Sequence, residues 1–182
     1  VPYARLFDQP LNDWDVSAVT TMQSMFAGTS SPTSTSFNQP LNNWDVSNVT
    51  DMSSMFYNST TFNQNINNWN VSSVTNMSQM FRNADAFNQP LNNWDVSNVR
   101  NMQYMFQQND GYDQPLNDWT TSSLTNISFI FSGNSIYNHP LNNWDVSTVT
   151  NMGSAFNNAS AFNQNLGVWD ISSVTNLGNM LS

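Results

Sequence analysis

Cysteine, glutamate and lysine are all missing from this chain of 182 residues. Without cysteine there is no disulfide framework and no thiolate metal site. Only 8% of the residues are charged, against roughly 25% in an ordinary soluble domain, and the net charge is −9. Lys and Arg, the residues that bind nucleic acid and anionic membranes, number three together. No apolar run is long enough to span a bilayer. The composition therefore argues against nucleic acid as a partner and against membrane insertion by this segment.

A regular spacing of tryptophans dominates what is present. Seven tryptophans occur, and the last six follow one another at intervals of 25 residues. They are Trp14, Trp44, Trp69, Trp94, Trp119, Trp144 and Trp169. Such a period is the signature of one supersecondary unit copied along the chain, and we name each copy a rung. We expect a single domain over residues 1–182, taken from a longer array, with a Ser/Thr/Pro-rich loop insertion at 28–36 in the first rung.

The apolar pattern within a rung predicts a short strand followed by a helical turn. Trp44 and Val46 flank Asp45, which is the alternation of a strand with two inward side chains. The apolar positions from Val49 to Phe56 are spaced as on one face of a helical or 3-10 turn, with Thr50 as its N-cap. Stacked rungs would bury these side chains and align the strands in a parallel sheet. We therefore predict a repeat solenoid of about seven rungs with a core ladder of tryptophans.

The repeated frame Leu-x-x-Trp-x-Val-x-x-Val-x-x-Met-x-x-Met-Phe resembles the BspA-type leucine-rich repeats. It is more closely similar to the 25-residue WDVSNVTNMSSMF repeats of unknown function. Trp44 takes the second strand position of the BspA-type frame, Val46 the third, and Met55-Phe56 its Ala-Phe position. The resemblance covers essentially the whole chain. It implies a leucine-rich-repeat-like solenoid that is secreted or exposed at the cell surface, with relatives that act in adhesion, and it brings no catalytic residues.

The outward positions on either side of each tryptophan form the predicted ligand face. This face comprises Asp13, Asp15, Asn43, Asp45, Asn68, Asn70, Asn93, Asp95, Asp118, Asn143, Asp145 and Asp170. Stacked carboxylates repel unless they are hydrogen-bonded, screened or bridged by a cation. One interpretation is a calcium or polyhydroxylated-ligand surface, with Asp15, Asp45, Asp95, Asp145 and Asp170 as the weak calcium candidates. The other, which we favour because no compact calcium loop is present, is a solvated face whose Asp side chains cap nearby backbone or Ser groups.

Two further groups of residues have mainly structural interpretations. The Phe-Asn-Gln sequence recurs in most rungs, and His139, the single histidine, replaces Gln in one of them. We expect amide ladders there, with His139 as a hydrogen-bond substitute and not a general base. Asn-x-Ser/Thr sequons are no more frequent than chance predicts in so Asn- and Ser-rich a chain. Asn58 and Asn158, in the expected return loops, are the sites where N-glycosylation would be accessible.

These observations predict a protein that is not an enzyme. Equivalent, repeated Asp residues are hard to tune to different pKa values, as acid/base catalysis requires. No cofactor site is expected. The first hypothesis is an extracellular or cell-surface module for adhesion to, or recognition of, a protein or glycan. The alternative is a structural subunit of an extracellular fibre or cell coat, in which further copies of the chain stack end to end.

Overall fold

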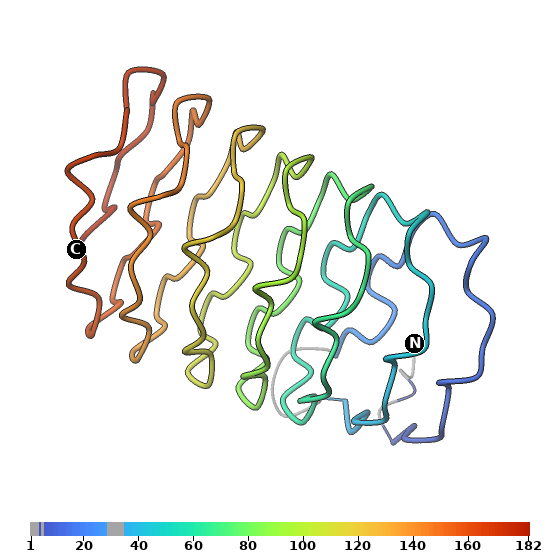
Figure 1. Cartoon of the computed structure of the whole chain (residues 1–182). Coiled ribbons are helices and arrows are strands. Elements are labelled where there is room, and N and C mark those ends of the chain that lie inside the picture. The colour runs from blue at the N-terminus through green and yellow to red at the C-terminus, as the bar shows by residue number, and fades with distance from the viewer. Residues whose placement is uncertain (1–3, 5, 29–34) are drawn as a thin grey trace.

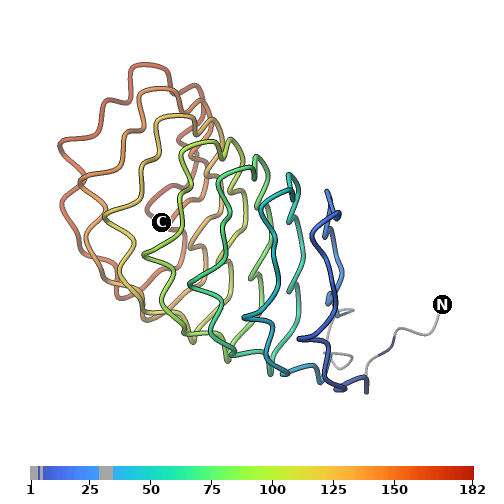
Figure 2. The same ribbon diagram turned by 45° about the vertical axis from the view of Figure 1, so that its right-hand side comes forward.

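The chain winds into a stack of coils, and each repeat makes one elongated turn (Figures 1 and 2). The computed structural model describes residues 4, 6–28 and 35–182, so 29–34 of the expected loop insertion lie outside the described residues. The seven rungs are 7–36, 37–61, 62–86, 87–111, 112–136, 137–161 and 162–182. Each lies directly against the next, and the first and last lie at opposite ends of the stack (Figure 1).

The predicted strand-plus-helix rung is wrong. Over the described residues there is no helix and no strand, and the only regular pairing consists of isolated parallel bridges between rungs. The bridges join Thr21 to Asp51, and then run through Asn76, Asn101, Asn126, Asn151 and Asn176. Residues 44–46, where the alternation predicted the strand, pair with no neighbouring strand. The rung is therefore neither leucine-rich-repeat-like in its secondary structure nor a β-plus-helix unit.

The backbone hydrogen bonds explain why no helical turn forms after Thr50. From Met52 to Asn58, every second amide donates to a carbonyl of rung 3: Met52 to Asn76, Ser54 to Ser78, Phe56 to Met80 and Asn58 to Arg82. The amides between them close turns inside the rung: Met55 to Met52, Tyr57 to Ser54 and Ser59 to Phe56. A 3-10 helix would use every amide internally. Here half of the amides bind the neighbouring rung, so the segment is a chain of turns cross-linked along the stack.

Backbone dihedrals at two positions per rung produce this alternation. Ser54 and Asn58 have φ values of 56° and 55°, and their equivalents in most other described rungs are also positive. Positive φ is incompatible with a right-handed helix and reverses the peptide plane, which turns alternate amides outward to the next rung. Asn and Gly recur at the Asn58 position, as the left-handed region favours. The Ser54 position carries no such signal, which is why the apolar spacing alone suggested a helix.

The tryptophan column forms a buried seam between rungs. Six of the rings, from Trp44 to Trp169, are 2–8% exposed. Each indole Nε1–H donates to the carbonyl of the Leu or Ile three residues before the preceding tryptophan, as Trp44 does to Leu11 at 2.9 Å and Trp94 to Ile66 at 3.0 Å. Trp14 is the exception to the predicted core ladder, because its ring is 55% exposed and no described rung precedes it.

Aromatic rings fill the rest of the interior. Phe56 stacks on Phe62 with 3.9 Å between ring centroids and lies 6.5 Å from Trp69 of the next rung. The same arrangement repeats at Phe81, where Phe87 lies at 4.1 Å. Phe56 and Phe81 therefore each pack on the first aromatic ring and on the tryptophan of the following rung. Rings buried to this extent dominate the energetics of folding, since each removes a large apolar area from water.

Polar side chains connect the rungs where the backbone does not. Asn12 Oδ1 accepts the amide of Asn43 at 3.0 Å, and Asn67 and Asn117 do the same for the following rungs. Thr50 is not a helix cap: its hydroxyl and its amide both donate to the Thr20 carbonyl, at 3.2 and 2.9 Å. The 25-residue period thus appears as hydrogen-bonded ladders that run perpendicular to the rungs.

Candidate functional site

All twelve residues of the predicted ligand face lie exposed on the surface of the stack. The face is held in place from below, because the tryptophans between its residues are buried from rung 2 onward. It therefore forms a regular polar surface whose side chains are spaced by the distance between rungs.

Most carboxylates of this face are engaged in local turns. Asp15 Oδ1 accepts the Ser17 amide at 3.0 Å and the Ser17 hydroxyl at 2.6 Å. The same turn recurs in the copies Asp45/Ser47, Asn70/Ser72, Asp95/Ser97, Asp145/Ser147 and Asp170/Ser172. Hydrogen bonding from the serine side chain, and then from its amide, lowers the pKa of each of these Asp carboxyls. These carboxylates are thus capped by serine, as the second interpretation of the face predicted.

The same geometry bears on the calcium hypothesis. Successive carboxylates belong to different rungs, and each uses one oxygen to close its own turn. Within the part of the chain that the structure describes, no group of three or more His, Cys, Asp or Glu side chains is placed to hold one metal ion. The face offers single oxygen ligands and not a calcium cage.

Rung 5 interrupts the face. There Thr120-Thr121 replaces the pair that the other rungs carry, which is Asp or Asn followed by Val or Ile, so the row of Asp/Asn–Ser turns is interrupted at Thr120. Thr121 is 1% exposed, and its hydroxyl donates to the Asp145 carbonyl at 3.0 Å. A hollow of about 360 Å³ opens at this point. It is lined by Asn117, Asp118, Trp119, Thr120, Thr121, Ser122, Asn143 and Asp145. We name it the rung-5 hollow.

The chemistry of the rung-5 hollow is that of a hydrogen-bonding site. Asp118 and Asp145 bring carboxylates, Thr120 and Ser122 hydroxyls, and Asn143 an amide. The ring of Trp119 contributes little open surface, since it is 2% exposed. Two other hollows, of about 660 and 330 Å³, are lined by residues of the last two and of the first rungs. Both of these hollows lie at the ends of the stack, whereas the rung-5 hollow lies within it.

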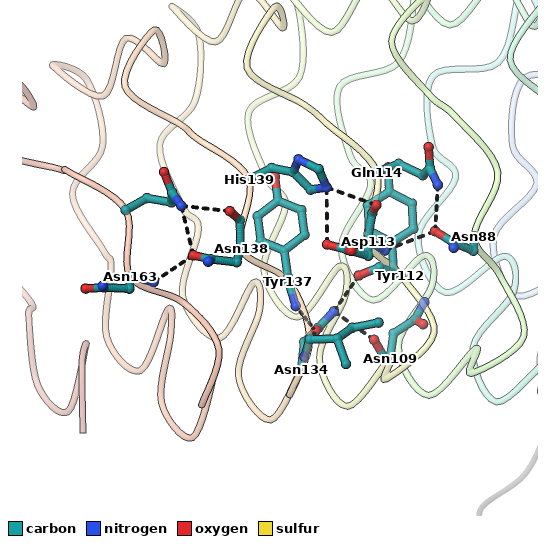
Figure 3. A network of polar contacts seen from close by, with 12 residues as sticks. Asn88, Asn109, Tyr112, Asp113, Gln114, Asn134, Tyr137, Asn138, His139 and Asn163 are labelled. Carbon is teal, nitrogen blue, oxygen red and sulfur yellow. Dashed lines mark hydrogen bonds and ion pairs between the residues drawn. The ribbon is translucent and has the colours of Figure 1, made fainter.

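A second polar network lies along the Phe-Asn-Gln edge (Figure 3). Asn88 Oδ1 accepts the amide of Asp113 and the side chain of Gln114, both at 3.0 Å. His139 takes the place of Gln in the next rung, and its Nε2 lies 3.0 Å from the Asp113 carbonyl and 3.2 Å from Asp113 Oδ1. The His139 ring therefore makes the rung-to-rung contact that Gln makes elsewhere, as its position predicted.

Two tyrosines lie beneath this edge. Tyr112 and Tyr137 occupy the Phe position of rungs 5 and 6, are fully buried, and have hydroxyls without a hydrogen-bond partner among the described residues. Burial raises the pKa of both hydroxyls. The neighbouring Tyr137 adds to the shift of Tyr112, and the Asp113 carboxylate adds to that of Tyr137. Neither hydroxyl reaches solvent, so the pair does not make a catalytic group accessible to a substrate.

Comparison with known proteins agrees with the repeat organisation. Residues 2–94, 29–133 and 86–182 each match the family described as "Mycoplasma protein of unknown function, DUF285". The chain belongs to this family. No curated protein and no solved structure matches the chain. The family is defined by repeats and its function is unknown, so it supports the repeat architecture without assigning an activity.

The remaining predictions for this DUF285 chain concern glycosylation and membranes. Asn58 is only 4% exposed, and its Oδ1 accepts the Asn83 side chain at 2.7 Å. The expectation that Asn58 is an accessible sequon is therefore wrong, because the loop folds into the stack, whereas Asn158 is exposed. Among residues 4, 6–28 and 35–182, no helix has the length and apolar character that a membrane crossing requires.

The rung-5 hollow is the feature that the sequence interpretation missed. The sequence does contain a signal for the hollow. In rung 5 the tryptophan is followed by Thr120-Thr121, whereas in every other rung it is followed by Asp or Asn and then by Val or Ile. Because the other copies repeat the turn so closely, this exception marks a place where the shape of the face changes.

Proposed function

We propose that this chain is a non-catalytic recognition module that binds a glycan at the rung-5 hollow. The observation that carries the proposal is the coincidence of the hollow with the break in the row of Asp/Asn–Ser turns at Thr120. Its volume of about 360 Å³ is within the range of small-ligand sites, roughly 300–1,000 Å³. Hydroxyls, an amide and two carboxylates converge there, and such groups provide both donors and acceptors for a polyhydroxylated ligand.

The electrostatics of the face support a non-catalytic role. The turn-forming Asp residues all have pKa values lowered by the same serine contact. Acid/base catalysis instead depends on neighbouring groups whose pKa values are pushed apart. Equivalent carboxylates with one common environment are suited to hydrogen bonding and not to proton transfer.

We place the module outside the cell or at the cell surface, where an adhesion role would operate. The likeness of the repeat frame to the BspA-type surface proteins supports this location, although their strand-and-helix rung does not carry over. A net charge of −9 would keep the module away from anionic lipid and polyanions. The alternative role is that of a subunit of an extracellular fibre. It requires filament formation and not glycan capture, so the experiment below distinguishes the two roles.

A glycan array compares the wild-type chain with two variants. Thr120→Asp adds a carboxylate to the hollow and, with Ser122 two residues later, re-creates the turn of the other rungs, and we expect it to weaken glycan capture about tenfold or more. Asn70→Asp is the matched control, because it adds the same charge at the equivalent position of rung 3, and it should change capture by less than about twofold. No capture, or equal capture by all three proteins, would refute the proposal. Uniform filaments in electron micrographs together with no capture would support the fibre.

A further inference from the structure

A second surface feature runs across four rungs on the turn-rich side of the coil. It consists of Tyr57, Arg82, Tyr104 and Phe129, one residue from each of rungs 2 to 5, and we name it the aromatic ridge. The Arg82 guanidinium carbon lies 5.5 Å from the Tyr57 ring centroid and 5.1 Å from that of Tyr104. Tyr104 stacks on Phe129 with 4.6 Å between centroids. The four side chains thus form one continuous stack along the surface.

The aromatic ridge is not part of the core. All four side chains are half-buried, whereas the core rings of the same rungs are fully buried. The ridge side chains also belong to a different segment of the rung from the rung-5 hollow, whose lining residues all precede Ser123 or lie at the equivalent place in rung 6.

The backbone beneath the ridge disfavours aromatic residues. Tyr104 and Phe129 have φ values of 61° and 59°, in the left-handed region that bulky side chains rarely adopt. The equivalent positions elsewhere hold Ser24, Ser54, Gln79, Ser154 and Asn179. Strain of this kind costs on the order of 1 kcal/mol per residue and is retained mainly where it has a use. Because these two rings do not complete the core, their use lies at the surface.

The Arg82 guanidinium makes one side-chain hydrogen bond to the described residues. A guanidinium has five N–H donors. One nitrogen, Nη1, donates to Gln79 Oε1 at 3.0 Å, while Nε is buried without a hydrogen-bond partner among the described residues. The chain contains 12 acidic residues, yet none in its described part forms an ion pair with Arg82. The buried Gln107 Oε1, at the position equivalent to Arg82 in the next rung, also lacks a partner there. The ridge therefore holds a cation ready for an anion from another molecule.

We propose that the aromatic ridge binds an extended segment of a partner protein that presents one Asp or Glu between apolar residues. The carboxylate would bind the terminal nitrogens of the Arg82 guanidinium, because Nε is buried, and the apolar neighbours would lie against Tyr57, Phe129 and the edge of the Tyr104 ring. Arg and Tyr are the residues most enriched among energetically dominant interface contacts. This surface adds a partner to the glycan-binding role and does not depend on it.

Charge and size decide between this partner and other anions. The net charge of −9 repels nucleic acid and sulfated polysaccharides, and so favours a ligand with a single negative charge at the site. Three steps of about 5 Å make the ridge about 15 Å long, which an extended peptide covers with four or five residues. Both faces of the Tyr104 ring are occupied, by Arg82 and by Phe129, so this ring cannot serve as a platform for a sugar.

The test uses displayed heptapeptide libraries with a fixed central Glu or, for comparison, a fixed central Gln. We expect wild-type protein to retain peptides of the Glu library selectively. Arg82→Gln should reduce this retention about tenfold or more, the loss typical of a charge-assisted hydrogen bond. Arg100→Gln is the matched control, since Arg100 is exposed outside the ridge and its substitution removes the same charge. Tyr104→Ser, which installs the residue found at the equivalent Ser54, should weaken retention without unfolding the protein.

Several results would overturn the inference. Equal retention of the Glu and Gln libraries would show that the partner's carboxylate is not recognised. Equal loss of retention in Arg82→Gln and Arg100→Gln would show that the effect comes from the net charge of the protein and not from the ridge. Capture of sialylated glycans that depends on Arg82, without peptide capture, would make the ridge a sugar site instead. Melting temperatures of all variants show whether a loss reflects unfolding. Thr120→Asp should leave peptide retention unchanged, so failure at the rung-5 hollow and failure at the ridge are separate results.

Discussion

Replacing Tyr112 with Phe should stabilise the protein. The Tyr112 ring lies 4.2 Å from Phe106 and 6.0 Å from Phe87, and Phe can keep both contacts. The hydroxyl is buried and has no hydrogen-bond partner in the described part of the chain, so it carries a desolvation cost without a compensating bond. Such a group costs about 1–3 kcal/mol, and we expect Tyr112→Phe to raise the free energy of unfolding by an amount in that range. Urea denaturation followed by tryptophan fluorescence measures the change.

The matched control is the reverse substitution one rung earlier. Phe87 is fully buried at the position equivalent to Tyr112, and Phe87→Tyr would introduce the hydroxyl that Tyr112→Phe removes. We expect it to lower the free energy of unfolding by about 1–3 kcal/mol. If Tyr112→Phe is instead destabilising, the hydroxyl makes a bond within the folded protein and the reasoning from burial fails.

High pH provides an independent measurement on the same side chains. Burial raises the pKa of Tyr112 and Tyr137 in the folded chain above the ordinary value of 10.0. Their contribution to stability is therefore complete below pH 10 and is lost as the pH rises, because the unfolded chain releases phenolic protons that the folded chain keeps. Above pH 10, each of the two tyrosines should lower the free energy of unfolding by about 1.4 kcal/mol per pH unit. The chain has neither Lys nor Cys to complicate the titration, and the Tyr112→Phe/Tyr137→Phe double variant should lose most of the alkaline decline.

Three further predictions follow from the packing and the turns. Trp94→Ala should lower the free energy of unfolding by about 3–5 kcal/mol, whereas the same change at the exposed Trp14 should cost about 1 kcal/mol, and equal losses in urea denaturation would contradict the seam of Trp Nε1 bonds. Gly111→Ala should destabilise by about 1–3 kcal/mol, because a Cβ there would overlap the Asp85 carbonyl oxygen, while Gly167→Ala serves as a control whose nearest contact, Asn165 Oδ1, lies at 3.1 Å. Asp95→Asn should keep its turn, as Asn70 does with Ser72, and so change stability by much less than 1 kcal/mol at neutral pH. Because the Ser97 contacts lower the folded pKa of Asp95, its contribution is present above about pH 4 and is lost in acid, and acid melting curves of Asp95→Asn should decline less steeply than those of the wild type.

The sequence was informative about what recurs and what faces inward. Trp44 and Val46 point into the core, as their spacing around Asp45 predicted, and Asp45 is exposed. His139 makes the contact of the Gln that it replaces. Which side chains point inward depends only on their local spacing and on the need to bury large rings. It can therefore be predicted without knowing the backbone conformation.

The secondary structure of the rung could not be obtained in this way. The spacing from Val49 to Phe56 fits a helical turn, but Ser54 adopts a positive φ that serine does not signal. The amides of Met52 and Ser54 find their acceptors in Asn76 and Ser78, 24 residues further on. No pattern inside a single repeat reveals whether an amide bonds within its own rung or to the next one.

The sequence by itself determined the 25-residue period, the inward set of tryptophans and aromatic residues, and the polar face between them. The period is a property of the sequence itself, and the hydrophobic effect favours burial of the same apolar residues in any backbone conformation. Only the tertiary structure decided where the rungs bond to one another, that Asn58 is buried, and that the rung-5 hollow and the aromatic ridge exist. These features arise from contacts between residues about 25 positions apart, which become neighbours only when the coils stack.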